Sequence, residues 1–244
     1  HPVQVETVAW VAEQKNLFST LFAFAAMMAY LRFDAAPAGR TARRWYAAGL
    51  LCYVLGLLSK TVVVTTPAIL LIILWWRSGT ITRRDLKRLA PWFLAALIMI
   101  PMAIWSERSQ VGTHGTAFDF SWPQRFLMAS HGVWFYLRTL VWPYPLTLIY
   151  QKYNIDPHTL PPWLYLLLTA VVAATLWMLR RRIGRGPIAA FAAFLVMLSP
   201  ALGFVSFYTL LYTYTADHYQ YFACAPLFLF LGGSASWACG RVVG

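Results

Sequence analysis

The stretch LFSTLFAFAAMMAYLRFDAAPAGRTARR, residues 17–44, decides the fold of this chain. Residues 17–31 carry no charge, and a loop with four arginines and one aspartate follows at once. Cytoplasmic loops of membrane proteins carry such an excess of basic residues. The stretch therefore predicts a helix that crosses a membrane and ends on the cytoplasmic side.

The same pattern recurs along the chain. Loops 32–44, 77–88 and 180–185 hold four, five and four of the 20 Lys and Arg residues, but only two of the eight acids, Asp34 and Asp85. The formal net charge of +12 therefore reports membrane orientation. It does not indicate nucleic-acid binding, because no soluble basic module with interleaved aromatic residues is present.

The composition is too apolar for a soluble domain, with 60% hydrophobic and 11% charged residues. The three cysteines lie in apolar segments without the spacing of a metal site, so we predict packing cysteines, no metal and no cofactor. The chain begins at His1 rather than Met and stops after an apolar run. We therefore expect an internal piece of a longer protein.

We predict an all-α, polytopic membrane bundle of about seven transmembrane helices plus one outer interfacial helix, in a single domain over residues 1–244. Most of the predicted spans approach the ~20 residues that cross a bilayer, and tryptophans flank several of them. These spans are 17–32, 45–59, 61–76, 89–105, 163–179, 187–205 and 222–239.

Segment 125–141 cannot cross alone without placing the arginines of 180–185 outside. We therefore expect an interfacial helix there, with His131 and Arg138 on one face. Two further crossings within 125–150 are the alternative.

Four polar clusters interrupt the apolar pattern, and this topology places all of them on the outer face. In the first, a continuous helix would align Glu6, Trp10 and Glu13 on one face, and Asn16 would cap the first span. The clusters are residues 1–16, residues 59–67 around Lys60, the loop with Glu107, Arg108, His114 and Asp119 that continues to Arg125, and residues 213–221.

Each cluster also has a structural interpretation. Residues 1–16 could form an amphipathic interfacial helix, and Lys60 could extend its ammonium group to the interface instead of binding phosphate. The loop around Glu107 could be solvated, and the tyrosines near Asp217 could decorate a loop or line an active site.

Residues 1–19, HPVQVETVAWVAEQKNLFS, resemble the HPxxxExVAWVxERKDxLS signature of bacterial polytopic membrane proteins with tetratricopeptide repeats. Those proteins are similar to the eukaryotic transmembrane-and-tetratricopeptide-repeat O-mannosyltransferases. Three further elements resemble, in order, the family's SKPxxVTLPxxLLLxDxW, WPxxLxxxY and ADRYTY segments. They are Ser59-Lys60 with Thr66-Pro67 and Trp75-Trp76, Trp142-Pro143 with Leu146 and Tyr150, and residues 216–221. The chain departs from the family at Gln14, Asn16, Thr61 and His218, where Arg, Asp, Pro and Arg are usual.

The resemblance implies a GT-C-type glycosyltransferase that uses a polyprenyl-phosphate sugar donor and a protein or glycan acceptor. It would work at the extracytoplasmic face of the bacterial inner membrane, with no nucleic acid as partner. We assign Glu6 and Asp217 as catalytic carboxylates and Lys15 and Lys60 as ligands of the donor phosphate. We assign substrate binding to His1, His218, Tyr219 and Arg138. The family's catalytic base lies in an outer loop that would precede His1.

Two other functions remain open from the sequence. A transporter or flippase of a lipid-linked or anionic substrate would place ionisable groups near the bilayer midplane. A membrane anchor for a repeat scaffold would need no outer carboxylates.

Overall fold

The computed structural model describes residues 1–113 and 115–243, and within those ranges it contains helices and loops but no strand. The predicted all-α fold is therefore confirmed. Its α-helices are α1 Val5–Ala9, α2 Gln14–Ala35, α3 Arg40–Ser59, α4 Thr66–Ser78, α5 Arg83–Ser109, α6 Trp122–Val141, α7 Leu160–Leu179, α8 Gly186–Leu198 and α9 Ala225–Val243. Short 3-10 helices connect them, of which η1 Pro2–Gln4, η2 Val11–Glu13, η3 Thr61–Thr65, η5 Ser199–Ala201, η6 Tyr208–Leu211 and η7 Asp217–Gln220 matter below.

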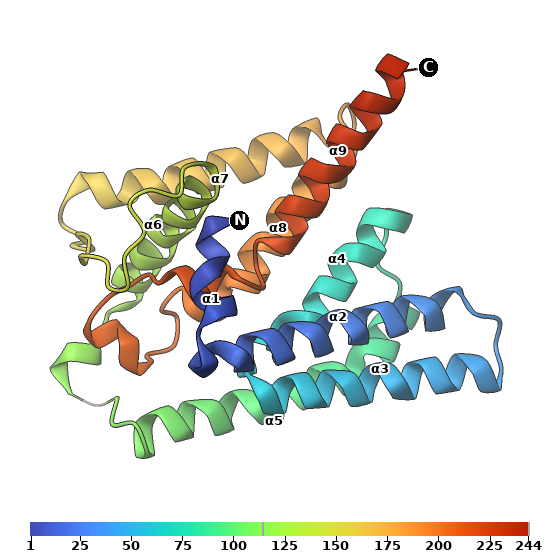
Figure 1. Ribbon diagram of the computed structural model, residues 1–244, viewed down its shortest axis with the longest axis horizontal. Coiled ribbons are helices and arrows are strands. Elements are labelled where there is room, and N and C mark those ends of the chain that lie inside the picture. Colours follow the sequence, from blue (N-terminus) through green and yellow to red (C-terminus); the bar gives the residue numbers. More distant parts are fainter. Residues whose placement is uncertain (114, 244) are drawn as a thin grey trace.

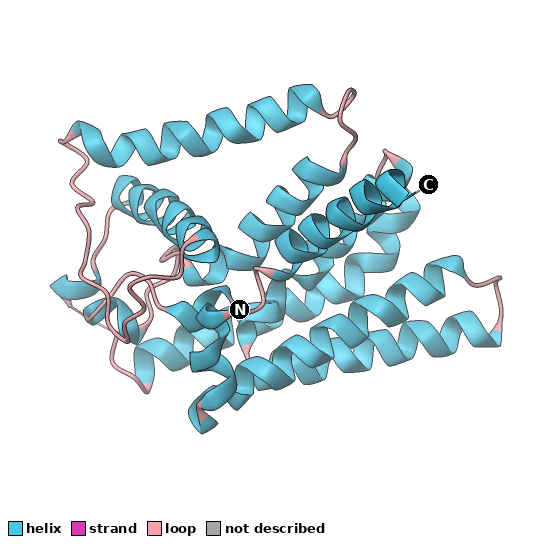
Figure 2. Ribbon diagram, turned by 45° about the horizontal axis from the view of Figure 1, so that its top comes forward, coloured by secondary structure: helices cyan, strands magenta, loops and turns pink. Residues whose placement is uncertain are grey.

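The long helices run back and forth between two ends of the molecule. The turns after α2, α4 and α7 contain the three basic loops and lie toward the right in Figure 1; we call this the basic end. Segments 142–159 and 202–224 lie at the opposite end, with the amino-terminal helices close to them; we call this the loop-rich end. Figure 2, turned by 45°, shows the same separation.

Four helical stretches are long and apolar enough to cross a membrane, which indicates a membrane protein. They are Val11–Ala35, Thr61–Ser78, Arg83–Ser109 and Leu160–Leu179. The segments Gly186–Ala201 and Ala225–Ser236 are apolar but shorter. The predicted span 45–59 lies in α3, which begins with several arginines.

Two predicted spans are not α-helical throughout. In the predicted span 187–205, α8 ends at Leu198 and the 3-10 helix η5 follows, with Pro200 in its first turn. The predicted span 61–76 starts with the 3-10 helix η3 and becomes α-helical at Thr66, directly before Pro67. Proline at the first turn is tolerated because that N–H has no intrahelical partner.

Segment 125–141 is confirmed as a helix, since α6 begins at Trp122 and ends at Val141. The loop after α6 lies at the loop-rich end, as the helix itself does (Figure 1). Leu127, Val133 and Tyr136 are buried, and α7 packs along the helix.

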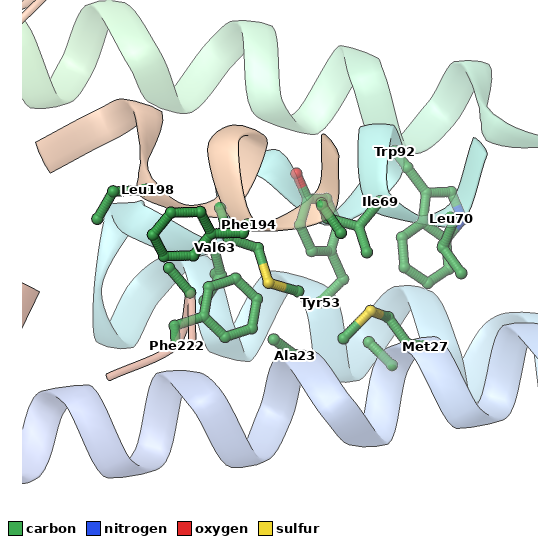
Figure 3. Packing of buried hydrophobic residues seen from close by; sticks show 14 of the residues in the cluster. Ala23, Met27, Tyr53, Val63, Ile69, Leu70, Trp92, Phe194, Leu198 and Phe222 are labelled. Atoms are coloured by element: carbon green, nitrogen blue, oxygen red, sulfur yellow. The ribbon is translucent and has the colours of Figure 1, made fainter. Parts of the chain in front are cut away.

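The core lies where α2 and α3 pack together and α4, α5 and α8 close over them. Figure 3 shows Ala23 and Met27 of α2 facing Tyr53, Ile69 and Phe194. Small residues allow the close approach of α2 and α3: a Cβ added at Gly49 would lie 3.3 Å from the carbonyl oxygen of Ala26. Small residues at a crossing are common between membrane helices, where backbones approach closely.

Candidate active site

The opening stretch does not form one continuous helix. Trp10 adopts an extended conformation, with φ −86° and ψ 124°, and separates α1 from η2. Glu6 and Glu13 therefore do not share a helix face. The first long helix begins at Gln14, so the prediction that Asn16 caps it is also wrong.

Glu6 and Asp217 nevertheless come together, although 211 positions separate them. Glu6 lies in α1, which packs against η7, the short helix that carries Asp217 and His218. Nδ1 of His218 lies 2.9 Å from Oε1 of Glu6, and the two side chains are 15% and 13% exposed. The hydroxyl of Tyr150 donates to the carboxylate of Asp217, at 2.9 and 3.0 Å from its two oxygens. We call Glu6, Tyr150, Asp217 and His218 the carboxylate cluster.

Two hydrogen bonds to residues of α6 hold η7 in place. The backbone N–H of Ala216 donates to the buried Tyr136 hydroxyl at 3.2 Å, and the Gln220 amide donates to Thr139 at 3.2 Å. Both contacts come from one face of α6 and flank Asp217 in sequence. They fix the carboxylate relative to the helix and reduce its freedom to turn toward solvent.

Burial raises the pKa of Asp217 from 3.8 to about 6. The Tyr150 hydroxyl opposes this rise by stabilising the charged form, whereas the nearby negative charge of Glu6 adds to it. A carboxylate with a pKa close to neutrality can accept and return a proton near physiological pH.

A second group of polar side chains joins the start of α2 to the turn between α3 and η3. Nζ of Lys60 donates to Oδ1 of Asn16 and lies 3.8 Å from Oε2 of Glu13. The Asn16 amide also donates to Glu13, and Nζ of Lys15 lies 3.8 Å from the other Glu13 oxygen. We call Glu13, Lys15, Asn16 and Lys60 the lysine cluster.

The two lysines of this cluster differ in their environment. The Lys15 side chain is 53% exposed, whereas that of Lys60 is 24% exposed. Burial lowers the pKa of Lys60 to about 8, although the carboxylate of Glu13 opposes this by favouring the ammonium form. Lys60 is therefore mainly charged at neutral pH, and it loses that charge more readily than a free lysine side chain does in water.

Tyr219 lies within electrostatic reach of both clusters. Burial raises the pKa of Tyr219 to about 12, and the carboxylates of Glu13 and Glu6 add to this rise. Its hydroxyl bonds to Thr209 of η6, and its ring lies 4.4 Å from the His218 ring, nearly perpendicular to it.

A cavity of about 280 Å³ opens beside the carboxylate cluster. Glu6 and Asp217 line it together with Trp10, the segment 146–148 and the apolar residues Pro2, Val3 and Val5. Trp10 is 43% exposed, so a large aromatic surface stands at the rim of the cavity. Aromatic rings next to carboxylates form a surface on which a sugar ring can stack while its hydroxyls bond to the acids.

Two predicted site residues lie apart from these clusters. Nε2 of His1 lies 3.1 Å from the Leu140 carbonyl oxygen in the last turn of α6, and the His1 ring contacts Phe228. Arg138 is exposed in the same turn of α6, and its side chain makes no hydrogen bond or ion pair within the described ranges. Its predicted neighbour on this face, His131, stacks between Tyr153 and Tyr165, at 3.7 and 4.2 Å.

The third polar cluster has a structural role where the structure describes it. Arg125 donates to the backbone carbonyls of Gly203 and Phe204 and to Ser206, which ties α6 to the chain after α8. Glu107 accepts from the backbone of Tyr208. His114, which the sequence grouped with Glu107, Arg108 and Asp119, lies outside the described residues.

The sequence-based assignment missed three members of these clusters, namely Tyr150, Glu13 and Asn16. Tyr150 appeared only as the end of the element that begins at Trp142-Pro143, yet it bonds to both oxygens of Asp217. Glu13 was placed on a helix face, yet its side chain is 8% exposed and links both lysines. The polar residues at 13–16 are the sequence signal for this pairing, because an acid that becomes buried next to a lysine and an asparagine needs them as partners.

In the part of the chain that the structure describes, no three His, Cys, Asp or Glu side chains lie close enough to hold a metal ion. Comparisons with protein-family models, with curated proteins and with solved structures found no match for this chain.

Proposed function

We propose that this chain is part of an integral membrane glycosyltransferase of the GT-C type. It would transfer a sugar from a polyprenyl-phosphate donor to a hydroxyl of a protein or glycan, at the extracytoplasmic face of the bacterial inner membrane. The observation that carries the proposal is that Glu6 and Asp217 line one cavity, while Tyr219 lies within electrostatic reach of both Glu6 and Glu13, the acid that Lys60 approaches. A polyprenyl-linked donor needs no nucleotide-binding fold, since the activated sugar reaches the site through the bilayer.

The arrangement of the helices supports this sidedness. In our proposal α2, α3, η3 with α4, α5, α7, α8 and α9 are seven spans of alternating direction, and α6 lies in the outer interface. The basic end then faces the cytoplasm, in agreement with the excess of positive charge in cytoplasmic loops. The carboxylate and lysine clusters face the opposite compartment.

The proposed chemistry assigns one role to each cluster. The acceptor oxygen attacks C1 of the sugar, and the bond from C1 to the phosphate oxygen breaks, so that the electron pair leaves with polyprenyl phosphate. In this proposal the carboxylate of Asp217 takes the acceptor proton in place of the base that the family resemblance puts before His1, since its pKa of about 6 suits a general base. Lys60, assisted by the exposed Lys15, neutralises the leaving phosphate.

The other members position these groups. Tyr150 holds both oxygens of Asp217, and His218 orients Glu6, which would accept hydrogen bonds from sugar hydroxyls. The sequence-based assignments of Tyr219, His1 and Arg138 to substrate binding remain predictions. Of the three, Tyr219 has the strongest support because it lies beside His218.

A carrier of lipid-linked sugar is the rival function, and one experiment separates the two. The full protein is placed in liposomes with radiolabelled polyprenyl-phosphate mannose or glucose and a peptide library rich in serine and threonine. We expect labelled peptide with the wild type, and a strong loss with Glu6→Gln and Asp217→Asn. Asp119→Asn is the matched control, because Asp119 is an exposed acid outside the cavity. Transbilayer movement of the donor without labelled peptide would contradict the proposal and favour a carrier.

A further inference from the structure

A second cleft lies at the basic end, and none of its lining residues belongs to the carboxylate cluster. It has a volume of about 720 Å³ and opens between the end of α4, the end of α7 and the turn before α8. Three indole rings and three guanidinium groups line it: Trp75, Trp76, Trp177, Arg180, Arg181 and Arg185. The remaining lining consists of two turn glycines, so no acid contributes to the wall.

Two stacked aromatic rings line part of this cleft. The rings of Trp75 and Trp177 lie 5.6 Å apart and within 14° of parallel, so they bridge α4 and α7. The guanidinium of Arg180 lies 3.9 Å above the Trp177 ring and donates to the Trp177 carbonyl. A cation held over an indole keeps a defined position without needing a carboxylate partner.

Gly79 brings a second guanidinium into the cleft. Gly79 ends α4 with φ +84°, in the left-handed region that favours glycine. A Cβ at this position would lie 2.3 Å from the Arg185 guanidinium, so any other residue would displace Arg185. The missing side chain at Gly79 leaves room for the Arg185 guanidinium.

The acids of the basic end are already used elsewhere. Asp34 pairs with Arg88 at 3.0 Å, and Asp85 caps the start of α5 through Thr82. Within the described ranges the guanidinium groups of Arg181 and Arg185 donate no hydrogen bond and form no ion pair. The cleft therefore concentrates positive charge that the protein itself does not neutralise.

We propose that this cleft binds the phosphate of an anionic phospholipid headgroup. Guanidinium groups form bidentate bonds to phosphate oxygens, and basic pockets between membrane helices on the cytoplasmic side suit lipid headgroups. Trp76 and Trp177 are about half exposed and sit where indoles anchor helices at the interface. The neighbouring Met178 is 76% exposed on an apolar helix, which provides a surface for acyl chains.

Native mass spectrometry of the full protein in detergent tests this proposal. The probe is phosphatidylglycerol, with phosphatidylcholine as the zwitterionic comparison and excess inorganic phosphate as a separate arm. Loss of two cleft cations in Arg180→Gln/Arg185→Gln should reduce retained phosphatidylglycerol about tenfold. The control pair Arg83→Gln/Arg84→Gln removes the same charge from the exposed start of α5, outside the cleft, and should change retention less than about twofold.

A second variant guards against a folding defect in the first. Arg181 is exposed and makes no described contact, so Arg181→Glu alters the charge of the cleft without altering its packing. We expect it to reduce retention with an unchanged thermal unfolding midpoint. Equal losses from the cleft pair and the control pair would overturn the proposal in favour of diffuse surface charge. Equal retention of the two lipids, or binding of inorganic phosphate alone, would also overturn it.

Discussion

Two side-chain pairs at opposite ends of the bundle have nearly the same length but different surroundings. Arg88 and Asp34 meet at 3.0 Å at the basic end, and His218 and Glu6 meet at 2.9 Å at the loop-rich end. The first pair lies among many exposed arginines. The second pair stands in a small group of buried acids beside a cavity, next to Asp217, which is 4% exposed.

This difference separates two uses of charge. Arginines at the basic end stay near water, so they cost little desolvation energy, and in the proposed topology they set the orientation of the helices. Burying Glu13 and Asp217 costs free energy that only specific partners offset. Charges retained at such a cost, with the pKa of one acid moved toward neutrality, are typical of a functional site.

The largest expected effect follows from Asp217. If its carboxylate accepts the acceptor proton, Asp217→Asn should lower the rate of sugar transfer about 100-fold or more, since general-base catalysis contributes that much. Asn keeps an oxygen that can accept from Tyr150, so the fold should remain intact. Transfer to a peptide acceptor measures the effect. Full activity of Asp217→Asn would show that the buried acid has no catalytic part.

Substitutions of Lys60 test whether the lysine cluster, unlike the arginines of the basic end, binds the donor phosphate. Lys60→Gln should raise the donor KM about tenfold, because a charged contact to phosphate is lost. Lys60→Arg should restore part of it. Lys152→Gln removes an exposed lysine elsewhere on the loop-rich end and serves as the control. Similar KM values for all three variants would break the assignment of the donor phosphate to the lysine cluster.

The two ends should also differ in their response to pH. Transfer should rise about tenfold per unit as the pH approaches about 6, where Asp217 ionises. It should fall again above about 8, where Lys60 loses its charge. Lipid retention at the basic end should stay constant over the same range, since guanidinium groups remain charged. A transfer profile without the lower limb in the wild type would contradict the role of Asp217.

The free energy of unfolding should also depend on the ionisation of Asp217. The folded chain binds the Asp217 proton more tightly than the unfolded chain does, because burial raises its pKa from 3.8 to about 6. Raising the pH from about 4 to about 6 should therefore lower the free energy of unfolding. Asp217→Asn should remove this slope in thermal unfolding measured in detergent. An unchanged slope would mean that another group titrates.

The smallest expected effect is a difference in coupling free energy between the two side-chain pairs. A double-mutant cycle with Glu6→Ala and His218→Ala should give a coupling free energy of about 2 kcal/mol, as for hydrogen bonds to charged groups in protected sites. The cycle with Asp34→Ala and Arg88→Ala should give less than about 1 kcal/mol, as for pairs near the surface. Equal values would remove the energetic distinction between the two ends.

The sequence predicted the helical fold and much of the site for clear physical reasons. Uncharged runs next to basic loops predicted helices, and the structure confirms them as helices. The structure brings Glu6, Asp217 and His218 together, as counting the crossings led us to expect, and their side of the membrane stays a prediction. Local backbone geometry was harder to predict. Nothing in the spacing of Glu6 and Glu13 indicates the extended conformation of Trp10 between them.

Contacts between residues far apart in the sequence were also not predicted. Tyr150 reaches Asp217 from an irregular segment 67 positions away, which periodicity cannot reveal. The cleft at the basic end depends on Gly79 and Arg185, which lie on different turns. Their contact follows from the packing of α4 against α8, and single-sequence patterns do not report helix pairing.

The central claim, that the two ends lie on opposite sides of the membrane, can be measured by cysteine labelling. The native cysteines are first replaced by Cys52→Ala, Cys224→Ala and Cys239→Ser. Asp119→Cys and Arg181→Cys then report the loop-rich end and the basic end, both from exposed positions. A membrane-impermeant maleimide should label position 119 in intact cells, and position 181 only after the inner membrane is permeabilised. Equal labelling of both positions in intact cells, or the reverse order, would contradict the account.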